Sequence, residues 1–463
     1  MTTDVAATKT APASVIRSWA LFDFANTGFY VIMITLVFPV YFNDVLAGGN
    51  ESVWGTVIAI SMLITALIGP LLGSIADASG RTKRFLGIFT ALSIAATIGL
   101  FFGAVPGSLT LAAILIILAN IGFEGGTIFY DALLPRIAAR ADITRISAYG
   151  WAIGYAGSFL ALILVMVTLP DEPSNREVRS MFLIAAGIFA LFAIPLFVKV
   201  PEEKEPASRE PVSLGNGYRR LRETVDHIWE HRGVFWFLAA FFFYNDGILT
   251  VIMMASIFMA TTLNFTTGEQ ITFFLIVQAT ALGGSLLFGR IAERIGPRAT
   301  IMITLAIWIG IVIAAFFVAG TTGFYVIGGV AGLALGSSQS TSRTLMALLS
   351  PPERSAEFFG FYDGFFGPGT GSFFSLTGVA LRGQDLITAT AQAKALNFAS
   401  NIASLTLFVV GGKVLWVTGA VMIVGQMAGA WLGSHAVLRG GARLIRPLIV
   451  IVCLAMLLRY LFG

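Results

Sequence analysis

Polar and ionisable side chains recur inside otherwise apolar stretches of this chain. The sets are Asp23 and Asn26; Asn120, Glu124 and Asp131; Asn245 and Asp246; and Gln339 and Arg343. Residues three or four apart share one helix face. An ionisable group inside a membrane-spanning helix is costly and by default faces the bundle interior or a water-filled path. These side chains are therefore predicted to line a path for a substrate or a proton.

Glu124 is the strongest candidate for a proton carrier in this set. No Lys or Arg lies deep enough in the first ten apolar segments to neutralise it permanently. Its carboxyl is therefore expected to bind and release a proton, as an acid–base group does. For Asp23 and Asp246 the alternative is local capping or pairing that fixes helix packing. Arg343 is interpreted either as a topology anchor or as a contact for an anion.

The composition sets the kind of element that positions these groups. The chain has 463 residues, of which 57% are hydrophobic and 12% are charged. Soluble domains carry about 25% charged residues, so this low charged fraction indicates a membrane protein. Apolar runs of about 20 residues recur, and in hydrocarbon they must be helical to satisfy their own backbone. The predicted fold class is an all-α polytopic membrane protein, with residues 1–17 as a disordered cytoplasmic tail.

Ten spans are predicted before residue 350. They lie at 19–42, 53–75, 85–105, 109–132, 148–169, 179–198, 233–259, 271–291, 299–318 and 322–349. Basic clusters follow every second span, which places these loops and the amino terminus in the cytoplasm. The predicted organisation is a six-span half at 18–198, a cytoplasmic linker at 199–232, and a second half at 233–357 that is truncated to four spans.

An internal repeat supports the two halves. The loop after the second span contains GSIADASGRTKR, and the loop after the eighth contains GRIAERIGPR. Each has a glycine, an acid four residues later, a second glycine and adjacent bases. The repeated positions, predicted to act as gating loops, are Gly73, Asp77, Gly80, Arg81, Gly289, Glu293, Gly296 and Arg298. The acid is expected to pair with loop arginines or helix-end amides in one conformation and release them in another.

These loops resemble the inter-span signature of the major facilitator superfamily. Within it, residues 17–360 are similar to the "unknown major facilitator" family, which includes autophagy-related vacuolar amino-acid effluxers. The similar stretches are 19–42, 119–138, 241–256 and 336–362. The resemblance implies a helical bundle that works by alternating access about a central cavity, with secondary active transport.

The end of the chain resembles another family. Residues 358–463 are similar to the carboxyl-terminal half of the sulfite/sulfonate exporters of the TauE/SafE (TSUP) type. The matching positions proposed as an anion site are Asp363, Gly367, Gly369, Lys394, Asn397 and Asn401. A Gly/Pro-rich break exposes backbone amides that suit an anionic oxygen. The alternative, favoured because the partner half is missing, is that these groups only satisfy one another.

The two resemblances meet near Gly360, so the chain is interpreted as a chimera with about four exporter-like segments at its end. If residues 358–380 span the membrane, Arg382, Lys394 and the arginines at 439–446 fall outside, against the positive-inside rule. The conflict disappears if residues 361–375 are re-entrant, as buried irregular backbone allows. The first exporter-like segment is therefore expected to be re-entrant or poorly inserted.

Three functions follow from these features. The first is a major-facilitator-type secondary carrier for a small polar metabolite, with amino acids as candidates and protons as the coupling ion. The second is a sulfite or organosulfonate exporter, and the third is a membrane fusion protein that transports nothing. Three His and one Cys leave little for an enzyme or a metal centre, so neither enzyme nor cofactor is expected. The expected partners are the lipid bilayer and a small solute, without nucleic acid, in a bacterial inner membrane.

Overall fold

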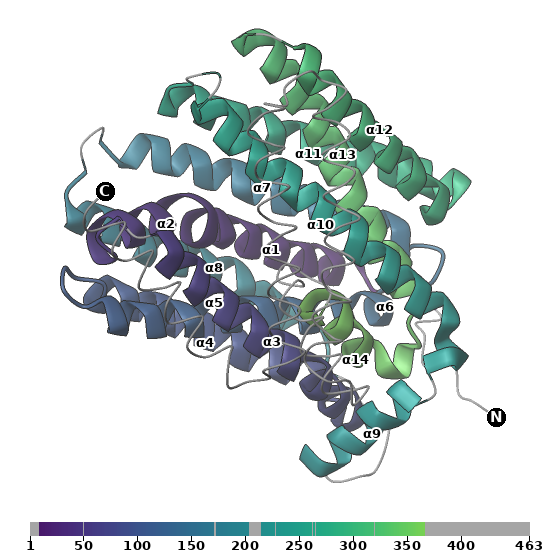
Figure 1. Ribbon diagram of the computed structural model, residues 1–463. Helices are drawn as coiled ribbons and strands as arrows, with labels where there is room; N and C mark the ends of the chain where they lie inside the picture. Colours follow the sequence, from purple (N-terminus) through teal and green to yellow (C-terminus); the bar gives the residue numbers. More distant parts are fainter. Residues whose placement is uncertain are drawn as a thin grey trace, which may run out of the picture. The chain divides into compact units, whose positions relative to one another are not determined.

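Ten long helices occupy the ten predicted spans in the part of the chain that the structure describes (Figure 1). The structure is a computed structural model, and it describes residues 9–365 apart from 50, 171–172, 203–213, 227, 262, 264 and 319. No β-strand occurs among these residues. Eight helices in this part are long and apolar enough to cross a membrane. The prediction of an all-α polytopic membrane protein is confirmed.

The first half contains six of these helices and the second half contains four. The first-half helices are α1 Ala13–Tyr30 with its continuation to Leu46, α3 Glu51–Ser79, α4 Thr82–Gly103, α5 Leu109–Ala132, α7 Ile143–Thr168 and α8 Asn175–Lys199. The second-half helices are α10 Arg232–Thr261, α11 Thr267–Ile295, α12 Pro297–Phe317 and α13 Thr321–Leu349. Shorter elements are α6 Leu134–Ile137, α9 Leu214–Asp226, η3 Ile228–His231, η4 Pro352–Arg354, α14 Ser355–Phe359 and η5 Gly360–Phe365.

The first span is not one regular helix. After Tyr30 it passes through the π-helical turns η1 Val31–Leu36 and η2 Phe42–Leu46, with α2 Val37–Tyr41 between them. Pro39 lies in α2 and has no N–H to donate, which disfavours a continuous α-helix here. Wide turns inside helices are common near functional sites. Apolar periodicity alone predicts the span but does not predict these turns.

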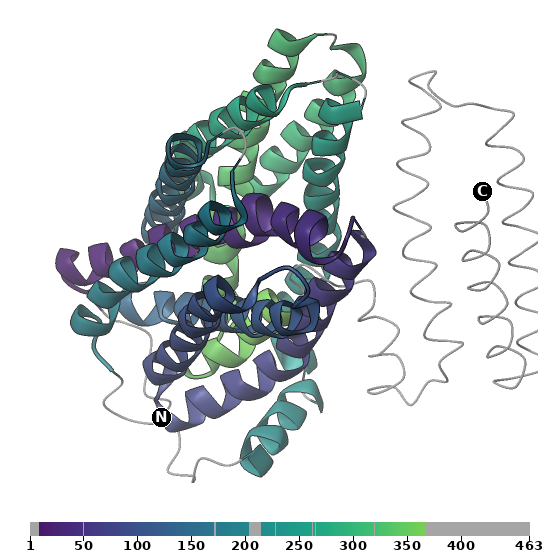
Figure 2. The ribbon, with the colours of Figure 1, turned by 90° about the vertical axis from the view of Figure 1, so that its left-hand side faces the viewer.

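Helix α7 joins the two halves. It packs against α1 of the first half and against α11 and α13 of the second, and Figures 1 and 2 both show it between these helices. Close approach to α1 depends on Gly157, because a Cβ there would overlap the carbonyl of Phe24. Small residues of this kind let helix backbones meet closely in membranes. The approach fixes the distance between the polar residues of α1 and those of α7.

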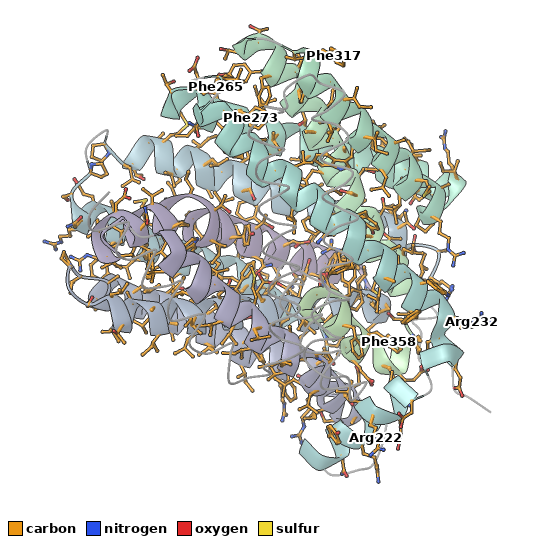
Figure 3. All side chains as sticks on the ribbon, in the orientation of Figure 1. Arg222, Arg232, Phe265, Phe273, Phe317 and Phe358 are labelled. Atoms are coloured by element: carbon orange, nitrogen blue, oxygen red, sulfur yellow. The ribbon has the colours of Figure 1, made fainter. Side chains whose placement is uncertain are left out.

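The apolar core is divided between two clusters. The larger one includes Trp19, Phe22, Phe38 and Phe189 of the first half, together with Phe358 and Phe359. The smaller one lies in the second half. Figure 3 shows Phe265, Phe273 and Phe317 at the opposite end of the second-half helices from Arg232 and Phe358. The end that holds Arg232 and Phe358 also holds the start of α1 and the α3–α4 turn, and is called the N-terminal end below.

The segment that crosses the predicted junction packs on the first half. Residues of α14 and η5 contact α3 and α5, and Gly360 lies directly against Gly69 and Pro70. Small residues therefore face one another across this contact, as in tightly packed membrane helices. Of the predicted anion-site residues, Gly367, Gly369, Lys394, Asn397 and Asn401 lie outside the described residues, as does most of the segment expected to be re-entrant.

Candidate transport path

Arg343 of α13 is held by two carboxylates of the first half. Its Nη1 donates to Asp23 Oδ2 at 2.9 Å and to Asp131 Oδ1 at 3.0 Å. Its Nε donates to Ser147 Oγ at 3.2 Å, and its Nη2 donates to the Ser147 carbonyl at 2.8 Å. The arginine side chain is 1% exposed. Charge-assisted hydrogen bonds of this kind are about twice as strong as neutral ones, and they compensate for the loss of water.

Three aromatic rings complete the surroundings of the guanidinium. Its central carbon lies 5.0 Å from the ring centre of Trp19, 5.2 Å from Trp151 and 5.8 Å from Tyr130. Trp19 and Tyr130 stack on each other with their centres 4.7 Å apart. Faces of aromatic rings attract cations, most strongly where water is excluded. In this structure the arginine is a buried cation that connects α13 to α1, α5 and α7, whereas the sequence offered a topology anchor or a contact for an anion as its role.

Glu124 differs from the two aspartates because it has no cationic partner. It is buried in α5, and it makes no hydrogen bond or ion pair with any residue that the structure describes. Tyr30 and Asp363 lie within electrostatic reach of it. The Oδ2 atom of Asp363 is itself buried without a hydrogen-bond partner among the described residues. A charged carboxyl without a partner has a high free energy inside a membrane bundle. A proton or a bound cation would neutralise it.

The amide side chains predicted on the path bridge neighbouring helices. Asn26 donates to Thr127 at 3.3 Å, Asn120 donates to Ser61 at 2.8 Å, and Gln339 donates to Asn245 at 3.3 Å. The carbonyl oxygens of Asn26 and Asn120 are buried without partners in the described part of the chain. The side chain of Asp246 lies outside the described residues. Unpaired acceptors of this kind mark places where water or a polar ligand would gain hydrogen bonds.

The first of the two repeated loops is held in a network. Asp77 Oδ1 accepts from Arg136 Nη2 at 2.6 Å and from the Ala356 backbone at 3.1 Å, and Oδ2 accepts from the Glu357 backbone at 2.8 Å. Arg136 also donates to Thr82 and Ser355. The acid thus engages an arginine and backbone amides together, where the sequence predicted one or the other. Arg81 follows at the exposed start of α4.

The second loop also turns at a glycine, but among the described residues it lacks this network. Gly80 and Gly296 both have positive φ, 62° and 86°, a conformation that favours glycine. Glu293 and Arg298 are exposed, and Glu293 makes no hydrogen bond or ion pair with the described residues. It lies in a groove of about 550 Å³ lined by α1, α7 and α11, with Arg145 and Gly289 among the lining residues.

Several residues around Arg343 were not predicted from the sequence. Ser147 lies at the start of a span with no distinguishing neighbours in the sequence. Trp19 is fully buried and packs against the guanidinium. A signal was present in the spacing of Trp19 and Asp23, which lie one turn apart and therefore on one face of α1.

Two families match different parts of the chain. The family described as "Vacuole effluxer Atg22 like" matches residues 47–381, and "Sulfite exporter TauE/SafE" matches residues 339–460. The predicted junction at Gly360 lies where the matches overlap, so the interpretation as a chimera of two families is confirmed.

Relatives and solved structures agree with this division. YxiO of Bacillus subtilis (strain 168), described as an MFS-type transporter, is 31% identical over 414 residues, which cover 86% of this chain and 93% of the relative. YfcA of Escherichia coli (strain K12), described as a probable membrane transporter, is 57% identical over 104 residues, only 39% of its own length. The human organic anion transporter MFSD10 superposes with a TM-score of 0.62 at 14% identity, covering 86% of this chain and 99% of that one. The relatives are transporters, and the fold is that of the major facilitator superfamily.

Proposed function

The chain belongs to the Atg22-like vacuole effluxer family of major facilitator transporters, and we propose that it is a proton-coupled secondary carrier for a small polar metabolite. Amino acids are the first class to test. The proposal includes a bacterial inner membrane and a cytoplasmic amino terminus, for which the basic clusters and the bacterial relatives are the support.

The observation that carries the proton coupling is the contrast between Glu124 and its neighbours. Asp23 and Asp131 each have the charge of Arg343 within 3.0 Å, whereas Glu124 has no ion pair in the described part of the chain. A carboxyl that must be neutral when buried and charged when hydrated changes its proton occupancy as the bundle opens and closes. Glu124 is the group that exchanges the coupled proton in this proposal.

Alternating access requires contacts at one end of the bundle that form and break. At the N-terminal end, Arg343 links α13 to α1 and α5, and Asp77 links the last turn of α3 to the start of α14. Both contacts join the two proposed halves. We assign them to the conformation in which this end is closed, and the gating role of the repeated loops rests on that assignment.

The test of this function uses purified protein in liposomes that contain a mixture of amino acids and small organic acids. Solute movement is measured by mass spectrometry with and without a pH gradient. The wild type is expected to accumulate at least one solute when the gradient is imposed, and Glu124→Gln is expected to exchange that solute without responding to the gradient. Asp226→Asn, on the exposed face of α9, is the control and should behave as wild type. Equal gradient-driven accumulation by Glu124→Gln would contradict the proton role.

The match of residues 339–460 to the sulfite exporters favours one second candidate. In that case the chain exports sulfite or an organosulfonate, and Lys394 contributes charge to the anion site. Saturable sulfite efflux that is lost in Lys394→Ala and kept in Glu124→Gln would support it. Correctly inserted protein that moves no solute in either assay would instead support a fusion without transport.

A further inference from the structure

Among the described residues, the groups that contact the Arg343 guanidinium come from the first half, whereas Arg343 itself comes from the second. Asp23 and Trp19 lie on α1, Asp131 and Tyr130 on α5, and Ser147 and Trp151 on α7. These six residues are called the guanidinium cage below. The cage is therefore a set of groups from one half that surrounds a side chain of the other half.

The cage recognises a guanidinium by shape and by hydrogen bonding. Four of the five N–H groups of Arg343 have acceptors, two on Asp23 and Asp131 and two on Ser147. Gly150 forms a flat part of the wall, because a Cβ there would lie 2.7 Å from Nη2 and 2.9 Å from Asp23 Oδ2. A planar fork of donors fits this arrangement, and a compact ammonium would use fewer of the acceptors.

The charge around the cage favours a cation strongly. Two carboxylates face one guanidinium, and Asp363 lies within electrostatic reach of both carboxylates, with its buried Oδ2 unpartnered among the described residues. If α13 withdrew Arg343, Asp23 and Asp131 would be left in an aromatic pocket without a positive charge. Leaving a buried charge uncompensated is strongly destabilising. When the halves separate at this end, the two carboxylates must gain protons, water or another cation, and a second guanidinium fits the vacated arrangement of acceptors.

We propose that the guanidinium cage is the binding site for the guanidinium group of a cationic substrate, and that Arg343 occupies this site when the N-terminal end is closed. Arg343 is then a built-in competitor of the substrate: it neutralises the cage in one conformation, and the substrate neutralises it in the other. This inference rests on the proposed carrier function, because it needs α13 to move relative to α1 and α5. It adds a substrate class to that function.

The test removes the competitor and supplies its head group from solution. Arg343→Ala in detergent should unfold at a lower temperature than wild type. Guanidinium chloride at millimolar concentrations, well below denaturing levels, should raise this temperature with saturation. Urea, which is planar and uncharged, and sodium chloride at equal ionic strength should not raise it. Adding Asp23→Asn to Arg343→Ala should abolish the rise, because the cage then loses one carboxylate.

A second measurement applies if Arg343→Ala does not fold. In wild-type protein, methylguanidinium should compete with Arg343 and change the tryptophan fluorescence with saturation, since Trp19 and Trp151 line the cage, whereas methylurea should have no effect. The absence of a saturable response to methylguanidinium in wild type, or of guanidinium rescue in a folded Arg343→Ala, would overturn the proposal. Neither measurement needs transport. A cage that binds guanidinium in a protein that moves no solute would refute only the proposed function.

Discussion

The two repeated loops have the same sequence pattern and different surroundings. In the first, Asp77 is buried and accepts from Arg136 and from the backbones of Ala356 and Glu357. In the second, Glu293 is exposed beside a groove at the start of α7. Both loops turn at a glycine with positive φ. The shared pattern therefore places a glycine with positive φ in each loop, whereas the facing helix determines what the acid contacts.

The difference has a consequence for the conformational cycle. The first loop is engaged with the second half through residues 355–357, whereas the second loop lies near α7 of the first half without an ion pair in the described part of the chain. Interfaces with two discrete arrangements are the usual basis of such transitions. Variants of the two loops should therefore have unequal effects, and four comparisons of decreasing size test this.

The largest effect is expected from Asp77→Asn. The change removes the charge of the buried Asp77 carboxylate, which lies 2.6 Å from the largely buried Arg136, and an amide oxygen cannot replace both accepting oxygens. Breaking a buried pair by removing one partner costs about 3 kcal/mol or more. A clear decrease of the unfolding temperature in detergent is expected. An unfolding temperature equal to that of wild type would show that the network does not stabilise this conformation.

The first glycines of the repeat give the next comparison. A Cβ on Gly73 would overlap the backbone of Ala356 and Glu357, whereas a Cβ on Gly289 would meet the side chain of Ala148. Backbone atoms move away from an added methyl group less easily than side-chain atoms do. Gly73→Ala should therefore lower the free energy of unfolding by about 1–3 kcal/mol, the usual range for overpacking. Gly289→Ala should cost less, as measured by the same thermal unfolding. The reverse order would contradict the difference in packing.

The second glycines should give smaller and more similar losses. Alanine at Gly80 or Gly296 must adopt positive φ, at a cost of about 1–2 kcal/mol. Gly296, with φ 86° and ψ 154°, lies in a region that is almost restricted to glycine. Gly296→Ala is therefore expected to be the more destabilising of the two. Equal values for glycine and alanine at Gly296 would show that the turn relaxes.

The smallest effect is expected from Glu293→Gln. Its side chain is exposed and makes no ion pair with the described residues, so the stability should change by less than about 0.5 kcal/mol. This variant is the matched control for Asp77→Asn at the equivalent position of the repeat. A loss as large as that of Asp77→Asn would mean that the two loops are equally engaged.

The sequence predicted the elements well and their long-range contacts poorly. Apolar runs locate ten long helices of the described residues, because a helix in lipid must satisfy its own backbone. The pairing of Arg343 with Asp23 and Asp131 joins residues 320 and 212 positions apart. Periodicity does not specify which faces of distant helices meet, and the positive charge near a helix end suggested a topology role for Arg343. Glu124 could be singled out because the absence of a nearby cation is visible in the sequence itself.

The most direct test of an alternating bundle is the distance between the halves at the N-terminal end. Spin labels at Arg140 and Arg294, on exposed positions of the two halves, would be introduced with Cys453→Ser, which removes the one native cysteine. We expect a mixture of a shorter and a longer distance, a shift to the longer distance in Asp77→Asn, and no shift in Glu293→Gln. A single distance that neither substitution changes would contradict the proposal that Asp77 holds this end closed.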